Sequence, residues 1–226
     1  MEPDAPLGDL VSGGPARRPD RRRPRRGIGV RLEPVEPERD AEPLWRATND
    51  GTGRGDAVWT YLAHGPYASV EEMHDWLGSL VPSEDPLFLT VHTDDGPSGI
   101  VSFMSIDPEM RRIELGNIWY APRAQRTGAN TETIYLLLGE AFDELGYRRV
   151  EWKCNALNAR SRGAAERLGF TFEGVFRQHM VVKGRNRDTA WYSMLDTEWP
   201  SARDAFERWL AAPTDARPSL ASLRDR

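Results

Sequence analysis

The spacing of apolar residues divides the first half of the chain into two helices and four strands. In two segments the apolar residues recur every three or four positions, which predicts helices over 38–49 and 70–80. Apolar and polar residues alternate in four others, which predicts strands over 28–35, 87–92, 99–106 and 113–120. Short turns separate the last three strands, so we expect them to pair antiparallel.

The second half begins with a glycine-bearing turn and a long helix. This helix is predicted from Gly128 to Gly146, with a broad apolar stripe between these two residues. The remaining elements are expected to be a strand, a short helix, a closing hairpin and a last helix, over 149–154, 159–168, 170–182, 189–195 and 202–210. No repeat is visible, so the pattern favours one α/β domain.

Composition supports a single water-soluble domain. The chain has 226 residues, of which 39% are hydrophobic and 29% charged, and no segment approaches the ~18 apolar residues of a membrane span. No signal peptide is recognisable, and the single cysteine, Cys154, cannot form an internal disulfide. We therefore expect a cytoplasmic protein that is a monomer or a homodimer and has no membrane partner.

The two ends of the chain look less ordered than its middle. Residues 1–27 hold seven arginines against four acids, without apolar periodicity, which predicts a disordered Arg-rich tail. Such an arm also suits RNA or a ribosome, although no aromatic residues are interleaved and nucleic acid is not the favoured partner. The domain is expected over 28–200, a C-terminal helix over 201–212 and a flexible tail over 213–226.

The segment from Glu114 to Asp196 carries the most specific motifs. It contains the turn RAQRTGAN starting at Arg123, then NALNARS ending at Ser161, then AAERLGF and FEGVF. In this order the segment resembles the cofactor-binding half of the GNAT superfamily of N-acetyltransferases, and most closely the ribosomal-protein N-acetyltransferase-like branch. The resemblance implies the GNAT acyl-CoA N-acyltransferase fold, a mixed and mostly antiparallel central sheet flanked by helices, with acetyl-CoA as co-substrate.

The turn before the long helix is expected to bind the pyrophosphate of acetyl-CoA, because free N–H groups and the helix dipole favour an anion there. A dinucleotide-binding turn is the rival interpretation, but GxGxxG is absent. Arg126 stands where the family pattern has glycine, which puts an unaltered turn geometry in question. By resemblance the cofactor-binding residues are Ile118, Trp119, Arg123, Gln125, Arg126, Thr127, Gly128, Ala129, Asn130 and Asn158.

Three residues are candidates for proton transfer. By resemblance Ser161 lies near the cofactor sulfur and protonates the leaving thiolate, because the position of the tyrosine used in other branches is Ala165 here. Ser161 is equally explained as a residue that satisfies backbone donors at a helix start. Glu114 is the first candidate for general base, and His179 is another candidate that is also explained as a structural strand residue.

An amine acceptor is expected beside the loop that joins the first two helices. By resemblance Trp59, Tyr61, His64 and Tyr67 line the acceptor pocket, and ordinary packing under the loop explains them equally well. The four histidines show no ligand-like spacing, so no metal is expected. The sequence thus predicts transfer of acetyl from acetyl-CoA to a primary amine in a ternary complex. The alternatives are a weakened CoA-sensing module and an RNA-associated protein.

Overall fold

The structure, a computed structural model, describes residues 7–51 and 54–224. Within these residues eight strands form one sheet in the order β1-β2-β3-β4-β5-β6-β8-β7, and only β5 and β6 pair in parallel. The strands are β1 (Arg25–Arg26), β2 (Arg31–Pro34), β3 (Leu87–Thr93), β4 (Gly96–Asp107), β5 (Arg112–Tyr120), β6 (Arg149–Asn155), β7 (Thr171–Val182) and β8 (Arg185–Leu195). The mixed, mostly antiparallel sheet predicted from the sequence is confirmed.

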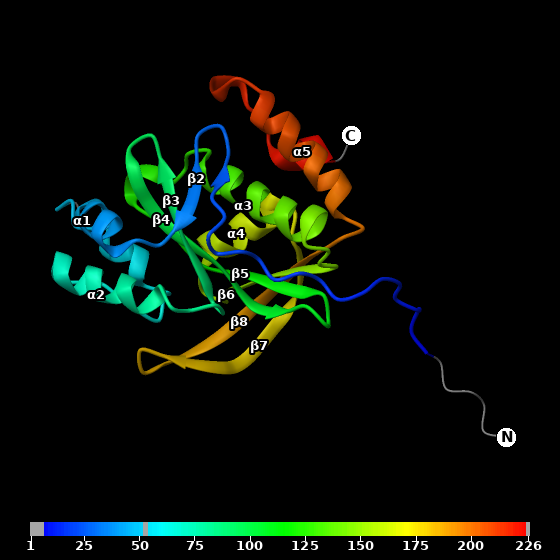
Figure 1. Cartoon of the computed structure of the whole chain (residues 1–226), viewed down its shortest axis with the longest axis horizontal. Helices are drawn as coiled ribbons and strands as arrows, with labels where there is room; N and C mark the ends of the chain where they lie inside the picture. Colours follow the sequence, from blue (N-terminus) through cyan, green and yellow to red (C-terminus); the bar gives the residue numbers. More distant parts are fainter. Residues whose placement is uncertain (1–6, 52–53, 225–226) are drawn as a thin grey trace.

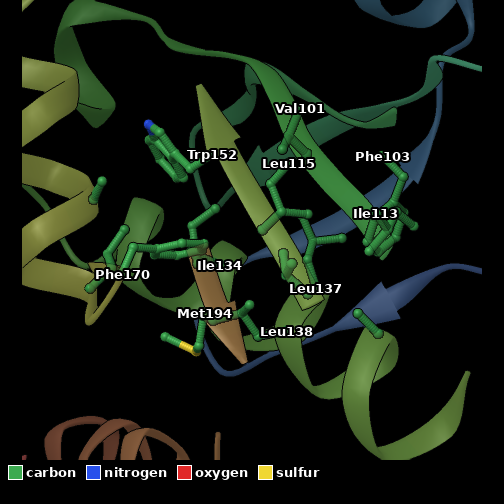
Figure 2. Close-up of a cluster of buried hydrophobic side chains, with 14 of the residues drawn as sticks. Val101, Phe103, Ile113, Leu115, Ile134, Leu137, Leu138, Trp152, Phe170 and Met194 are labelled. Atoms are coloured by element: carbon green, nitrogen blue, oxygen red, sulfur yellow. The ribbon is translucent and has the colours of Figure 1, made fainter. Parts of the chain in front are cut away.

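Helices cover both faces of this sheet (Figure 1). The helices are α1 (Pro37–Thr48), α2 (Val70–Leu80), α3 (Ala129–Gly139), α4 (Ala159–Leu168), α5 (Trp199–Ala211) and α6 (Leu220–Arg224). The larger apolar core joins one sheet face to α3, α4 and α5, and Figure 2 shows Ile113, Leu115 and Leu137 within it. A second, smaller core joins the opposite face to α1 and α2.

Local signals explain where the helices begin and end. Ser69 accepts a hydrogen bond from the Glu72 N–H at the start of α2, and Asn158 does the same for the Ser161 N–H at the start of α4. Gly169 ends α4 in the left-handed conformation, with φ of 103°. The long helix predicted from Gly128 is α3, continued by a π-helical turn over Glu140–Glu144.

Part of the Arg-rich leader, which was expected to be a disordered tail, packs against the domain. Arg25 lies in β1, and its guanidinium is buried in a bidentate ion pair with Glu140, at 2.6 and 2.7 Å. The N–H groups of Ile28 and Gly29 donate to Glu132 on α3. These carboxylates lie far away in the sequence, which explains why composition alone suggested a solvated segment. The prediction for residues 1–6 lies outside the described residues.

The tail expected over 213–226 is also packed for much of its length. Its short helix α6 buries Leu220 and Leu223 in the larger core, and α5 packs over α3 (Figure 1). Residues 225–226 lie outside the described part of the chain. No helix among residues 7–51 and 54–224 is long and apolar enough to cross a membrane.

Candidate active site

The central sheet opens between β5 and β6. These strands pair in parallel from Arg112–Arg149 to Leu115–Trp152, and the pairing ends there although both strands continue. Asn117 lies in the left-handed region, with φ of 52°, at an irregular register between β4 and β5. This bulge leaves backbone groups at the end of β5 without a partner on β6.

The turn that follows β5 presents N–H groups at the N-terminus of α3. Within the described residues no protein acceptor is found for the N–H of Arg126 or of Gly128, and Thr127 Oγ1 accepts from the Ala129 N–H. Arg126 has φ of 62°, so it adopts the conformation that a glycine would favour at this position. The substitution of glycine by arginine therefore leaves the left-handed turn in place.

Some side chains of the turn hold it in place by hydrogen bonds, and others are exposed. Gln125 Nε2 donates to the Tyr120 carbonyl at 2.8 Å, and Arg123 Nη2 donates to the Pro97 carbonyl at 2.6 Å. Arg126 is exposed and has no carboxylate partner among the described residues. Asn130 Oδ1 is buried without a hydrogen-bond partner within the same residues. The backbone and the Arg126 side chain are thus the groups most available to a phosphate.

On the α4 side of the opening, Asn158 and Ser161 lie together. Asn158 Oδ1 caps the helix by accepting from the Ser161 N–H at 3.1 Å, and Ser161 Oγ accepts from Trp152 Nε1 at 3.0 Å. The indole fixes the hydroxyl oxygen, and the hydroxyl also forms a hydrogen bond with the Cys154 thiol. Burial raises the pKa of the adjacent Cys154 thiol, which disfavours a thiolate nucleophile there.

On the opposite sheet face, Glu114 is buried within β5. Its Oε2 lies 2.7 Å from Lys153 Nζ and accepts from Ser105 Oγ at 3.1 Å. Its Oε1 is directed toward Gly116, since a Cβ added to Gly116 would lie 3.6 Å from that oxygen. Burial raises the pKa of Glu114, and the Lys153 ammonium and the Ser105 hydroxyl offset part of this effect.

His179 lies on β7, at the other end of the same sheet face. Its Nδ1 is 3.0 Å from Thr189 Oγ1, and its ring packs against Phe176 and Trp191. Lys153 Nζ lies 4.7 Å from the centre of the Trp191 ring. Trp191 and Lys153 therefore separate His179 from Glu114, and the two candidate bases do not meet directly.

Aromatic residues of the loop between α1 and α2 form a cluster around Trp59. Tyr67 and Trp119 lie with their ring centres 5.3 and 4.8 Å from that of Trp59, and His64 stacks on Trp76 at 4.4 Å. Burial and the nearby Lys183 ammonium lower the pKa of His64 to about 4, so its ring is neutral near pH 7. The side chain of Trp119, predicted at the cofactor, lies in this cluster.

Hydrogen bonds from two side chains hold the loop between α1 and α2 across the opening between β5 and β6. Lys183, at the tip of the β7–β8 hairpin, donates from Nζ to the carbonyls of Trp59, His64 and Gly65 at 3.0, 3.1 and 2.7 Å. The Tyr61 hydroxyl donates to the Leu157 carbonyl at 3.1 Å, just before α4. Tyr61 was expected to contact substrate, whereas Lys183 was missed because a hairpin lysine has no distinguishing sequence signal.

The described residues contain no group of three or more His, Cys, Asp and Glu side chains that is able to hold a metal ion. Ser161 lies on the α3–α4 side of the sheet, and Glu114 and His179 lie on the α1–α2 side.

The turn before α3 lies beside two parallel strands, β5 and β6, whose pairing ends early. A sequence comparison agrees with this arrangement. Residues 30–171 match the model of the acetyltransferase (GNAT) domain. The chain belongs to the GNAT acetyltransferase family. Acetyl transfer is therefore the general chemistry that this membership supports.

Solved GNAT structures share the fold over nearly the whole chain. A GCN5-related N-acetyltransferase from Brucella melitensis is 41% identical, with a TM-score of 0.91, over 96% of this chain and 100% of that one. A probable acetyltransferase of the GNAT family from Chromobacterium violaceum is 38% identical, with a TM-score of 0.78, over 88% of this chain and 100% of that one.

A curated relative agrees with the branch that the sequence suggested. YdaF of Bacillus subtilis, provisionally named a ribosomal N-acetyltransferase, is 34% identical over 106 residues, which are 47% of this chain. The match spans 57% of YdaF, so this GNAT chain covers little more than half of that relative. The name of YdaF agrees with the resemblance to the ribosomal-protein N-acetyltransferase-like branch, and the acceptor is a separate question.

Proposed function

We propose that this protein transfers an acetyl group from acetyl-CoA to a primary amine, on a protein N-terminus or a small molecule, by direct attack in a ternary complex. The observation that carries the proposal is the end of β5–β6 pairing at Leu115–Trp152, next to the free N–H groups of Arg126 and Gly128. The opening offers backbone groups to an extended pantetheine arm, and the turn offers donors to a pyrophosphate.

The residues of the turn fit an anionic cofactor. The N–H groups of Arg126 and Gly128 lack protein acceptors, and the helix α3 adds its positive end. Arg126 is exposed and without a carboxylate, so its guanidinium is available to the phosphates. Acetyl-CoA supplies the acetyl thioester as the acyl donor. Its pantetheine arm is assigned to the end of β5, at Ile118 and Trp119, and to Asn158.

Glu114 is the general base that the geometry favours. Lys153 and Ser105 engage Oε2 and leave Oε1 turned toward the bulge of β5, where an amine proton can be accepted directly or through water. Because burial raises the pKa of Glu114, this pKa lies closer to the pH at which a general base works. His179 lies beyond Trp191 and is assigned to the outer wall of the acceptor site.

Ser161 is the proton donor on the other side of the opening. Trp152 Nε1 donates to Ser161 Oγ and orients the hydroxyl, whose proton would move from the Cys154 thiol to a leaving thiolate. A backbone N–H at the end of β5 would polarise the thioester carbonyl, and such donors contribute a few kcal/mol, about 3, in other acyl transfers. The cluster around Trp59 and Tyr67 would wall the amine.

Two structural observations weaken the alternative functions. The positive φ of Arg126 removes the main reason to expect a blocked cofactor turn. Arg17, Arg23 and Arg25 of the leader contact Glu144 or Glu140, so these guanidiniums are not free for RNA. We therefore favour the enzyme, acting in the cytoplasm as a monomer or homodimer, over a CoA sensor or an RNA-associated protein.

A thiol-release assay with acetyl-CoA tests the activity across small amines and peptides with free N-termini. We expect release that depends on an amine and that falls at least about 100-fold in Glu114→Gln, within the range of a lost general base. Glu109→Gln, at an exposed carboxylate in the turn between β4 and β5, is the matched control and should retain most of the activity. Amine-dependent release that is equal in both variants would contradict the role of Glu114.

A further inference from the structure

The C-terminal segment places an arginine against the phosphate turn. A Cβ built on Gly128 would lie 2.9 Å from Arg217 Nη1 and 3.4 Å from the edge of the Trp209 ring. Arg217 follows the short turn η4 (Thr214–Ala216), and Trp209 lies on α5. Both residues therefore meet the N-terminus of α3, although they lie more than 80 positions further along the chain.

Arg217 and Trp209 form a stacked pair. The guanidinium carbon of Arg217 lies 4.1 Å from the centre of the Trp209 ring, and Arg217 Nε donates to the Ala212 carbonyl at 3.4 Å. Both side chains are partly buried. The stack fixes the plane of the guanidinium beside Gly128 and leaves its outer N–H groups available.

The charge of Arg217 is not balanced by a protein group. No carboxylate lies within salt-bridge distance of it in the described part of the chain, whereas Arg203 and Arg208 on the neighbouring α5 pair with acids. A cation beside the positive end of a helix is unfavourable by itself. Arg126 adds a second unpaired guanidinium to the same turn. Positive charge and free N–H groups thus converge at a place where no carboxylate of residues 7–51 and 54–224 forms an ion pair with them.

We propose that Arg217 is a further binding residue for the coenzyme A portion of the donor, and that its guanidinium donates to a phosphate group. Trp209 is the positioning residue that holds this guanidinium in place. The inference rests on the proposed function, because it assigns to the same turn a contact from the C-terminal segment. The shared chemistry is a phosphate, either of the pyrophosphate or of the 3′-phosphate of coenzyme A.

Isothermal titration with coenzyme A and with dephospho-coenzyme A tests this contact. Arg217→Gln should weaken the binding of coenzyme A on the order of tenfold, as expected for a charge-assisted hydrogen bond. A loss of the same size with both ligands assigns the contact to the pyrophosphate, and a loss confined to coenzyme A assigns it to the 3′-phosphate. Trp209→Leu should give a smaller loss with the same ligand preference.

Arg203→Gln is the matched control, because Arg203 is an exposed arginine of the same helix region that pairs with Asp143. It should bind both ligands like the unmodified protein. The melting temperature without ligand verifies folding, and Arg217→Lys, which keeps the charge, should fall between the unmodified protein and Arg217→Gln. Unchanged or tighter binding by Arg217→Gln would overturn the inference. Absence of coenzyme A binding by the unmodified protein would instead overturn the proposed function.

Discussion

Replacing Arg25 with methionine should strongly destabilise the fold. The side chains of Arg25 and Glu140 are each 3% exposed and are joined by two hydrogen bonds of 2.6 and 2.7 Å. Removing the guanidinium leaves the Glu140 carboxylate buried without a cation, which costs about 3–5 kcal/mol. For a protein of this size that corresponds to a fall in melting temperature of about 10 °C.

The assay is thermal and urea unfolding followed by circular dichroism. Arg23→Met is the control, because the Arg23–Glu144 pair is nearly half exposed and should contribute less than about 1 kcal/mol. The double variant Arg25→Met/Glu140→Leu should recover most of the lost stability, since it removes the uncompensated charge. Equal and small losses in Arg25→Met and Arg23→Met would refute the packing of the leader on α3.

Three further outcomes are expected. Ser161→Ala should lower kcat by about 100-fold while the Kd for acetyl-CoA changes less than about twofold, and an equal loss of binding would show that Ser161 holds the cofactor. The folded-state pKa of His64 is lowered to about 4, so its contribution to stability is present above pH 6.5. The free energy of unfolding should therefore fall by about 3 kcal/mol as pH falls from 6.5 to 4. Urea unfolding at these two pH values should show a weaker pH dependence of stability in His64→Gln. Lys183→Met should speed hydrogen exchange at Gly65, and unchanged exchange would mean that the three carbonyl contacts do not hold the loop.

Local patterns predicted most of the fold. The apolar spacing and caps of α2 and α4 gave the same bounds that the structure has, because Ser69 and Gly169 act within a few residues of the helices they limit. The contacts of the leader were not predicted, because they involve Glu132 and Glu140, more than 100 positions away. Charge composition describes a segment but not its distant partners.

The strands, turn and helices that frame the candidate site were predicted, whereas the positions of several side chains were not. The turn at Arg126 is left-handed despite the missing glycine, because the surrounding fold determines its backbone. The side chain of Trp119 lies in the acceptor-side cluster, since the bulge at Asn117 changes the alternation of β5. Lys183 and Arg217 reach the site from the hairpin and the C-terminal segment, and no local motif marks either one.

Isothermal titration of the full chain with acetyl-CoA tests the proposed co-substrate most directly. Free coenzyme A and NAD serve as comparisons. We expect micromolar binding of acetyl-CoA and coenzyme A and no binding of NAD, because the turn at Gly128 and the β5–β6 opening suit a pyrophosphate joined to an extended arm. Failure of both coenzyme A forms to bind, by a protein that unfolds cooperatively, would contradict the central claim.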